Sequence, residues 1–325
     1  MPSVFYVVLN SELCFDARAF IQMSFALGID LGGSSVKAVA VTPAGERLAQ
    51  INQPFDASTP GEWARLVQHT VQELEAQQGS PATAIGLSAP GLSARDGRSI
   101  ARMPGRLQGL EDLNWTEFLQ APQPVPVLND AHAALLGEAW LGAARGFQNV
   151  FLLTLGTGVG GAAIVDGKLL KGALGRAGHL GHVSLDLDGP RDVCAMPGSL
   201  EVMMGNCTIA ARSGGKFQTT HDLVSAHLAG DPGATEVWLR SVRALGVAIA
   251  GLINVLDPEA VIIGGGIARA GTALFEPLEK FVRDAEWNVG AVPVKILPAQ
   301  LGEFAGACGA AWNALESKLQ LARTR

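Results

Sequence analysis

The sequence predicts an α/β fold built from two related domains with a cleft between them. Apolar runs typical of strands, such as residues 25–30 and 150–155, alternate along the chain with segments that carry helix signals. Both of these runs lead into a glycine-rich turn with a hydroxyl residue and then into a second strand. This internal repeat indicates two copies of one unit, and 325 residues are enough for two domains.

The other elements follow from local signals in chain order. Thr59-Pro60-Gly61-Glu62 reads as a capping box with Pro at the first helical position, which predicts a helix to about Gln77. Asp166-Gly167 marks the turn of a hairpin over residues 162–170. The remaining strands are expected at residues 36–41, 84–88, 125–128 and 260–263, and the remaining helices at 131–143, 235–256 and 302–321.

Composition and charge argue against several classes of protein. The formal net charge is −6, the pI is near 5.5, and the 24 Lys and Arg residues are spread thinly, unlike a nucleic-acid surface. No apolar stretch matches the roughly 20 residues of a membrane-spanning helix, and residues 4–9 lack the basic residues of a secretory signal. The four cysteines are widely separated, as buried thiols in a reducing compartment are. We therefore expect a cytoplasmic protein with no nucleic-acid or membrane partner.

A glycine-rich loop at residues 156–161 formally matches the pattern GxGxxG. In dinucleotide-binding domains this pattern opens a helix, whereas here the following residues read as strand, turn and strand. Such a loop can wrap its backbone amides around phosphate oxygens, and the alternative is a tight turn without a ligand. The residues expected to contact phosphate are Gly156, Thr157 and Gly158.

A second loop of the same design follows the strand at residues 25–30. Asp30 stands at the strand end, where its carboxylate could hold a hydrated Mg²⁺; the alternative is a turn aspartate that caps backbone amides. Two such loops that face one another would clamp a nucleoside triphosphate. The residues expected to contribute here are Asp30, Gly32, Gly33, Ser34 and Lys37.

Two further strand ends carry candidate functional residues. Asp130 stands where a strand meets a helix, so it could be an ordinary N-cap or the carboxylate that accepts a proton from a hydroxyl nucleophile. The apolar strand at residues 260–263 ends in Gly264, Gly265 and Gly266. Three glycines allow close approach of a flat ring or a ribose, and the alternative is an ordinary turn.

Taken together, these motifs resemble those of the ROK family of sugar kinases. The family belongs to the superfamily of actin, hexokinase and heat-shock chaperone ATPases, so the resemblance implies an actin-like (ribonuclease H-like) fold with two domains, an interdomain cleft, and ATP and Mg²⁺ as cofactors. The motifs occur in the family's order: 30–37 is similar to the first phosphate motif, 129–131 with 137–138 to the catalytic segment, 155–161 to the second phosphate motif, 257–266 to the adenosine motif, and 305–311 to the closing hinge helix.

The resemblance also implies a division of the chain. Residues 23–126 are expected to form a small domain that the C-terminal helix, within 299–325, completes, and residues 127–298 a large domain. Residues 1–22 read unlike the rest, and we interpret them as an extension or a misassigned start before Met23. A homodimer is compatible with this organisation.

The family's signature stretch, residues 178–201, departs from the usual pattern. His179 replaces a sugar-binding glutamate, while His182 and Glu201 are retained. Of the three cysteines that usually bind zinc with the histidine, only Cys194 remains, because Asp192 and Ser199 occupy the other positions. Structural zinc requires four N or S ligands, so we expect none here. The substrate residues that the resemblance implies are Asn129, Asp130, His179, His182 and Glu201, although His179 and His182 could also be loop histidines bonded to the backbone.

The leading functional hypothesis is an ATP-dependent kinase of a hexose or an amino sugar, with Asp130 as the base on a primary hydroxyl. One alternative is a sugar-responsive transcriptional regulator, but 22 residues cannot supply the DNA-binding domain that such family members carry. Another is a sugar-binding protein that has lost catalysis, against which Asp130 and both phosphate loops count. The sequence leaves open which sugar is used and whether polyphosphate replaces ATP.

Overall fold

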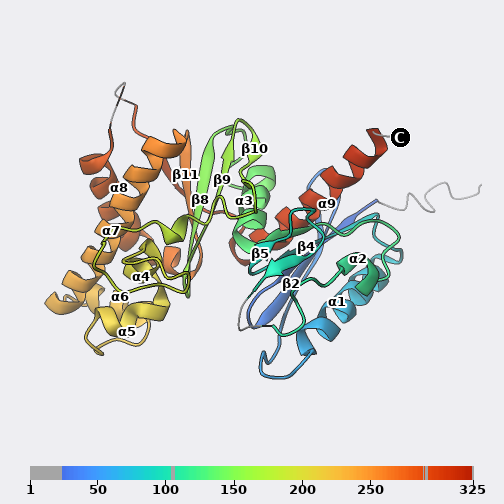
Figure 1. The fold of residues 1–325 in the computed structure, drawn as a ribbon, viewed down its shortest axis with the longest axis horizontal. Coiled ribbons are helices and arrows are strands. Elements are labelled where there is room, and N and C mark those ends of the chain that lie inside the picture. The colour runs from blue at the N-terminus through green and yellow to red at the C-terminus, as the bar shows by residue number, and fades with distance from the viewer. Residues whose placement is uncertain (1–23, 104–106, 288, 290–291, 324–325) are drawn as a thin grey trace, which may run out of the picture.

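The computed structural model describes residues 24–103, 107–287, 289 and 292–323. In these residues two five-stranded sheets form two halves, and helices α3 (Asp130–Leu141) and α9 (Ala305–Arg323) lie between them (Figure 1). Residues 1–22, interpreted above as an extension, lie outside the described residues. The expected two-domain actin-like α/β fold is confirmed.

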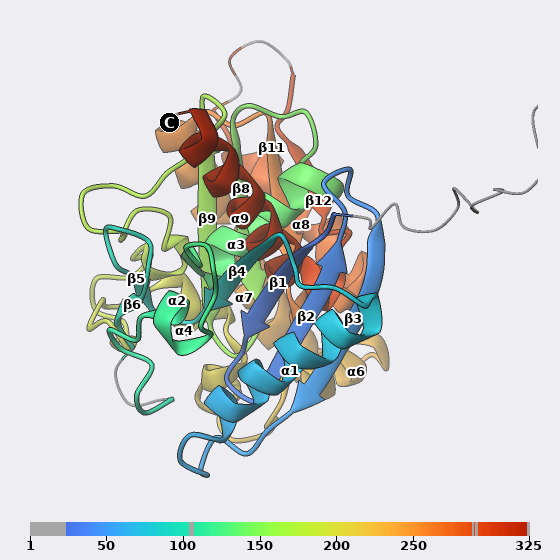
Figure 2. The same ribbon diagram turned by 90° about the vertical axis from the view of Figure 1, so that its right-hand side faces the viewer.

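The first sheet has the order β3-β2-β1-β4-β7. The hairpin strands are antiparallel, and β4 and β7 run parallel to β1. Helix α1 (Glu62–Gln78) covers one face and buries Trp63, Val67 and Leu74 against it (Figure 2). The bounds are β1 Ala26–Leu31, β2 Ser35–Val41, β3 Arg47–Pro54, β4 Ala84–Ala89 and β7 Val127–Asn129, and a small hairpin of β5 (Leu92–Ser93) and β6 (Ile100–Arg102) precedes helix α2 (Trp115–Phe118).

The second sheet repeats this arrangement with the order β10-β9-β8-β11-β12. Its hairpin strands are again antiparallel, and β11 and β12 run parallel to β8. The bounds are β8 Val150–Leu155, β9 Val159–Val165, β10 Lys168–Leu169, β11 Ala260–Gly264 and β12 Lys295–Pro298. The outer helices are α4 Leu200–Met204, α5 Ile209–Arg212, α6 Thr220–Leu228, α7 Pro232–Leu256 and α8 Thr272–Ala285. The predicted internal repeat is therefore present in the strand order.

Helix α7 is the central outer helix of this half. It buries Trp238, Leu245 and Ile249 in the core beside β8 and β11. Among the described residues it is the one helix that is long and apolar enough to cross a membrane, and half of its most apolar window is buried inside the protein. That burial is typical of a core helix.

Glycines allow α9 to pack unusually close to its neighbours. A Cβ atom on Gly28 of β1 would lie 1.8 Å from the Ala307 carbonyl oxygen, and one on Gly309 would lie 1.7 Å from the Ala133 carbonyl oxygen of α3. Helix α9 therefore contacts both the first sheet and α3 backbone to backbone. Any larger residue at these positions would push the elements apart.

A buried glutamate joins the end of α3 to the start of α9. Glu138 is fully buried, and its carboxylate accepts hydrogen bonds from the backbone amides of Ala143 (2.7 Å), Gln300 (2.9 Å) and Leu301 (2.8 Å). These bonds fix the connection between β12 and α9 against the end of α3.

The structure differs from the sequence expectations in three places. The predicted capping box at Thr59 is wrong, because α1 begins at Glu62 and its N-cap is Gly61, in the left-handed region with φ 71°. Strands β3 and β12 and helices α6 and α8 were not anticipated, since their apolar patterns are short or broken by polar residues. Strand β7 pairs with the first sheet, just beyond the boundary expected at residue 126, and the domain division itself stays a prediction.

We expect Gly309→Ala to destabilise the fold by about 1–3 kcal/mol, because the added methyl group meets the α3 backbone. Gly251→Ala is the matched control: Gly251 is an exposed glycine inside α7 with open space around its Cβ position, so its replacement should stabilise by about 0.5–1 kcal/mol. Urea unfolding of both variants measures the difference. Equal stabilities would contradict close α3–α9 packing.

Candidate active site between the two sheets

Asp30 lies at the carboxyl end of β1, on the side where α9 begins. Its carboxylate accepts a 2.7 Å hydrogen bond from the Ser88 hydroxyl on β4, and a Cβ on Gly306 of α9 would lie 2.7 Å from the carboxyl carbon. Burial and, to a smaller extent, the charge of Asp130 raise the pKa of Asp30 to about 6, although the Ser88 hydrogen bond and the charge of Lys37 oppose them. A carboxylate held this way favours a nearby cation, as the expected Mg²⁺ would supply.

The first loop is a tight turn between β1 and β2. The Gly32 amide donates to the Ser35 carbonyl oxygen at 2.9 Å, and Gly33 and Ser34 are exposed at the tip. Lys37 is the cross-strand partner of Asp30 in the β1–β2 register. No loop amide donates to Asp30 among the described residues, so the alternative in which Asp30 merely caps the turn does not describe this geometry.

The second loop connects β8 and β9, so it opens a hairpin and not a helix. This confirms the sequence argument against a dinucleotide-binding fingerprint. The Gly156 amide donates to the Gly158 carbonyl oxygen at 2.9 Å, and Thr157 is exposed at the tip. The two loops follow β1 and β8, which occupy the same central place in their sheets.

Behind the second loop lies a segment that sequence analysis did not identify. The backbone amides of Asn206 and Cys207 donate to the Gly156 (2.9 Å) and Thr157 (2.8 Å) carbonyl oxygens. Arg212 holds this segment through the Gly205 carbonyl oxygen (2.8 Å), the Thr208 hydroxyl (3.1 Å) and the hydroxyl of Ser241. Burial lowers the pKa of the Arg212 guanidinium to about 10, which still leaves it charged at neutral pH.

Asp130 is the first residue of α3, and Asn129 is the N-cap. The Asn129 side-chain oxygen accepts from the Ala131 (3.0 Å) and His132 (3.3 Å) amides, and its side-chain nitrogen donates to the Gly91 carbonyl oxygen at 2.9 Å. Asn129 is only 4% exposed. The N-cap alternative for Asp130 therefore does not hold, and Asn129, expected at the substrate, has a capping role in these contacts.

The Asp130 side chain is left exposed by this capping arrangement. Its carboxylate accepts a hydrogen bond from the Ala131 amide at 2.8 Å. Protein atoms nevertheless surround it, and the resulting desolvation raises its pKa above the usual value of 3.8. The charge of Asp130 contributes to the raised pKa of Asp30, so the two carboxylates are close enough to interact electrostatically. An accessible carboxylate with a raised pKa is a suitable general base.

Two histidines stand beside Asp130 and have different environments. His132 is 2% exposed, its Nε2 lies 3.0 Å from the Ala177 carbonyl oxygen, and burial lowers its pKa to about 4. His179 lies with its ring centroid 5.8 Å from that of His132, and its buried Nε2 has no hydrogen-bond partner among the described residues. Burial also lowers the pKa of His179, although the charge of Asp130 opposes this. The unpartnered nitrogen favours a ligand contact for His179 over a purely structural role.

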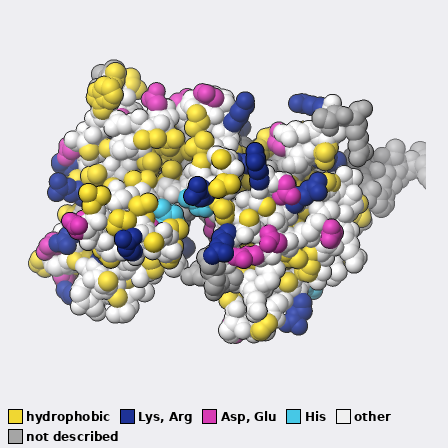
Figure 3. Space-filling view, in the orientation of Figure 1, with side chains coloured by type: hydrophobic (Ala, Val, Ile, Leu, Met, Phe, Trp, Pro, Cys, Tyr) yellow, Lys and Arg dark blue, Asp and Glu magenta, His cyan; other side chains and the backbone are white. Residues whose placement is uncertain are grey.

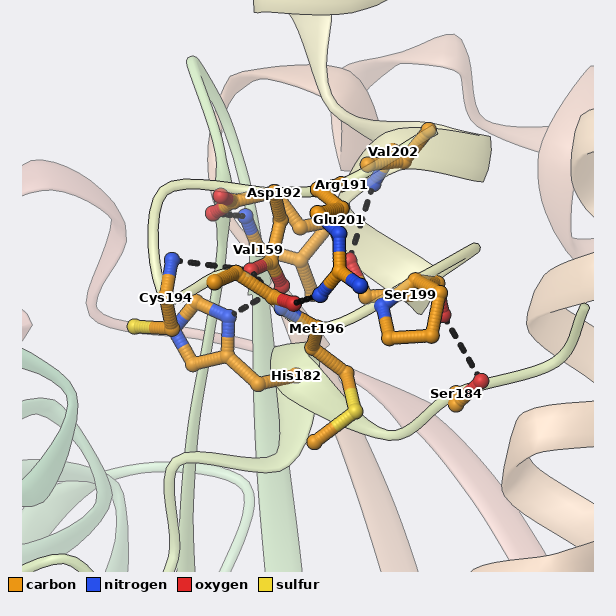
Figure 4. Close-up of polar contacts among 12 residues, drawn as sticks. Val159, His182, Ser184, Arg191, Asp192, Cys194, Met196, Ser199, Glu201 and Val202 are labelled. Carbon is orange, nitrogen blue, oxygen red and sulfur yellow. Dashed lines mark hydrogen bonds and ion pairs between the residues drawn. The ribbon is translucent and has the colours of Figure 1, made fainter. Parts of the chain in front are cut away.

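His182 and Glu201 belong to the signature loop, residues 178–201 (Figure 4). His182 Nδ1 lies 2.7 Å from the Asp192 carboxylate, and Nε2 lies 3.5 Å from Cys194 Sγ. Glu201 Oε2 accepts from the Val159 amide of the second loop at 3.0 Å. His182, expected to face the sugar, thus has both ring nitrogens engaged within the loop, whereas Glu201 connects the loop to β9.

The residues of this loop do not fit a structural zinc. The ligand atoms of His182, Asp192 and Cys194 lie within 4.8 Å of one another, but Ser199 supplies only a neutral hydroxyl. Burial raises the pKa of Asp192, yet the hydrogen bonds from His182, Ser199 and two backbone amides outweigh it and lower the pKa overall. Partial burial and the charges of Asp192 and Glu201 raise the pKa of Cys194, which favours the thiol over the metal-binding thiolate.

The glycine run after β11 contacts the second loop. Gly265 has φ 86°, and a Cβ there would lie 2.3 Å from the Leu155 carbonyl oxygen, so this position needs glycine for packing alone. Gly266 begins a 3₁₀ turn, and its Cβ position faces only the Arg269 guanidinium at 3.8 Å. The run brings exposed backbone next to the second phosphate loop, as the adenosine hypothesis requires.

A cavity of about 250 Å³ lies beside this site. The β5–β6 hairpin supplies Ser93 and Arg95 from the first half, the segment after β10 supplies Lys171 and Gly175 from the second, and His132 forms part of the wall. Figure 3 shows histidine side chains together with Lys and Arg between the two halves of the molecule. The space between the halves is therefore polar and basic at its edge.

Proteins of known activity are similar to this chain in sequence and fold. The sequence profile of the ROK family matches residues 26–317. A glucokinase from Thermotoga maritima is 32% identical over 305 residues, which cover 88% of this chain and 95% of the relative. A kanosamine kinase from Amycolatopsis mediterranei is 30% identical over 294 residues, with 88% and 94% covered. The crystal structure of a ROK family glucokinase from Streptomyces griseus in complex with glucose and AMPPNP has a TM-score of 0.76 and 26% identity, and covers 90% of this chain and 100% of that one.

We expect Arg212→Met to raise the Michaelis constant for ATP by about tenfold, because the backing of the second loop loses charged hydrogen bonds. The Michaelis constant of the acceptor should change little. Arg243→Met is the control, since Arg243 is an exposed residue of α7. Steady-state kinetics with each substrate varied in turn would measure the two Michaelis constants separately. Equal effects on the constants for ATP and for the acceptor would refute this role of Arg212.

Proposed function

The chain belongs to the ROK family and is a sugar kinase, and we propose that it transfers the γ-phosphoryl group of ATP to a primary hydroxyl of a hexose or an amino sugar. The observation that carries the proposal is the position of Asp130. Its exposed carboxylate with a raised pKa interacts electrostatically with Asp30, at the end of the strand that leads into the first phosphate loop. The proposed base and the expected Mg²⁺ site would thus lie within electrostatic range of one another.

The chain's own residues account for the chemistry of transfer. The sugar hydroxyl oxygen forms a new bond to the γ-phosphorus, its proton passes to the Asp130 carboxylate, and the bond to the bridging oxygen breaks so that ADP leaves with the electron pair. The amides of Thr157 and Gly158 and the Thr157 hydroxyl would stabilise charge on the transferred group, while the Gly156 amide closes the loop through the Gly158 carbonyl oxygen. Gly32, Gly33, Ser34 and Lys37 would do so from the first loop, and Gly264, Gly265 and Gly266 would border the adenosine. Mg²⁺, held near Asp30, would neutralise phosphate charge when bound.

The substrate side of the proposal rests on His179 and Glu201. The pKa of His179 is lowered, so its ring is neutral near pH 7. Depending on the tautomer, its unpartnered Nε2 can donate a hydrogen bond to a sugar hydroxyl or amine, or accept one from it. A glutamate at this position would accept hydrogen bonds only. A histidine there changes the selectivity for the substituents of the ring, and for this reason we include amino sugars beside hexoses.

The activity is tested by coupled ADP release over a panel of hexoses, amino sugars and N-acetylhexosamines, with polyphosphate as an alternative donor. Turnover of any of these sugars with ATP supports the proposal. A chain that binds sugar and ATP without turnover would instead be a sugar-binding protein or a regulator. No turnover and no sugar binding across the panel would refute a hexose or amino-sugar substrate.

We expect Asp130→Asn to lower turnover by about 10²–10⁴-fold while sugar and ATP binding are largely retained, because the amide cannot take the hydroxyl proton. Asp166→Asn is the control: Asp166 lies in the β9–β10 turn with φ 50°, a conformation that asparagine tolerates. Rapid-quench turnover and calorimetric binding separate chemistry from affinity. A variant with wild-type turnover would show that Asp130 is not the base.

The fall of kcat/KM at acidic pH should follow the protonation of Asp130. Its pKa is raised, so the ionised base is lost as pH falls through a value above the ordinary 3.8 of an aspartate. We therefore expect kcat/KM for the sugar to fall on mild acidification and to be constant above this pH range. Stopped assays with saturating ATP and Mg²⁺ would measure it. A profile that stays flat to about pH 4 would contradict an unusually basic Asp130.

A further inference from the structure

A single buried carboxylate organises the signature loop. The Asp192 side chain is 1% exposed. Its Oδ1 accepts from the Cys194 (2.8 Å) and Met196 (3.0 Å) amides, and its Oδ2 lies 2.7 Å from His182 Nδ1. Three groups from two separate parts of the loop thus converge on one side chain (Figure 4).

Bonds around this centre close the rest of the loop. The Arg191 guanidinium donates to the Ala195 carbonyl oxygen at 2.6 Å, and the Ser184 hydroxyl donates to the Pro197 carbonyl oxygen at 2.7 Å. The Leu200 amide donates to the Val183 carbonyl oxygen at 2.9 Å. The two ends of the loop are therefore held together next to the centre, where a zinc ion would otherwise cross-link the same residues.

Glu201 follows directly from this closed loop. Leu200 is fully buried, and Ser199 caps α4 through the Val202 amide at 3.4 Å, so the position of Glu201 is fixed relative to Asp192. Glu201 in turn accepts from the Val159 amide, next to the second phosphate loop. Loss of the hydrogen bonds to Asp192 would therefore change the positions of Glu201 and of the His179–His182 segment, which are the proposed sugar-binding residues.

We propose that Asp192 replaces a metal ion as the organising centre of the signature loop, and that it is a positioning residue for sugar binding that works without zinc. The role of the loop in sugar binding rests on the function proposed above. The claim that the loop is ordered without a metal ion does not depend on that function. The carboxylate provides charged hydrogen bonds where the family pattern provides thiolates. The loop needs no thiolate and is indifferent to chelators.

The first experiment measures the metal. Elemental analysis of the purified full-length protein should find no stoichiometric zinc. Dialysis against a chelator, followed by addition of Mg²⁺, should leave the calorimetric affinities for glucose and N-acetylglucosamine unchanged. One zinc per chain whose removal abolishes loop protection in amide hydrogen exchange would overturn the proposal. Because exchange over residues 182–201 needs no turnover, this result stands even if no sugar of the panel is phosphorylated.

The second experiment removes the charge. Asp192→Asn should raise the KM for the sugar by about tenfold with a smaller effect on kcat and on the KM for ATP, and should increase amide exchange over residues 182–201. Asp188→Asn, which changes an exposed residue of the same loop, is the matched control and should behave like the wild type. If Asp192→Asn and this control have the same KM and the same exchange, the proposal is wrong. If Asp192→Asn does not fold, the chelator experiment on the wild type decides.

The third experiment restores the family's ligands. The double variant Asp192→Cys and Ser199→Cys, which adds two thiols beside Cys194 and His182, should bind one zinc per chain and become sensitive to chelators in amide exchange. A double variant whose loop is equally protected with and without zinc would show that the group at position 192 does not organise the loop, and would count against the proposal.

Discussion

The contact between α3 and α9 is the constraint on which the site depends. Each helix follows the last strand of one sheet and packs on the other sheet: α9 lies on β1 and β4, and α3 on β8 and β9. Gly309 lets the two backbones touch, and Gly306 lets α9 begin directly beside Asp30. Because α3 begins at Asp130, the same contact fixes the separation of the two carboxylates. The geometry of the site is therefore set in part by glycines, which carry no functional group of their own.

This closeness has an electrostatic consequence. Two carboxylates that share one space disfavour each other's ionisation, and burial raises the pKa of Asp30 and of Asp130 further. The fold opposes this with the Ser88 hydroxyl at Asp30 and the Ala131 amide at Asp130. A divalent cation and a proton from a substrate hydroxyl are the species that relieve the remaining repulsion.

Sequence analysis identified features that lie within one stretch of the chain. It missed contacts that form only when elements distant in the sequence come together. The repeated strand and loop pattern predicted the two sheets, both phosphate loops and the place of Asp130, because each motif lies within one strand end. It did not find Ser88 or Arg212, since a serine and an arginine carry no signal until distant elements meet. It assigned Asn129 and His182 to the sugar, which stays a prediction, and it did not find that Asn129 caps α3 or that His182 bonds to Asp192 within the signature loop. Residue type alone does not distinguish a ligand from its support.

The two copies of the unit have diverged where substrates enter. In the first copy, α1 connects β3 to β4 after a short turn, whereas in the second copy about sixty residues separate β10 from the equivalent helix, α7. That insertion carries the signature loop, Glu201 and Arg212. It contacts the second phosphate loop from behind through Asn206 and Cys207 and from the side through Glu201. One insertion thus contacts the second loop and carries His179 and Glu201, which we propose as sugar-binding residues, so in the proposed function nucleotide and sugar binding share a common support. A carboxylate centre at Asp192 is enough to hold this insertion because both of its ends are already anchored to the second sheet and its helices.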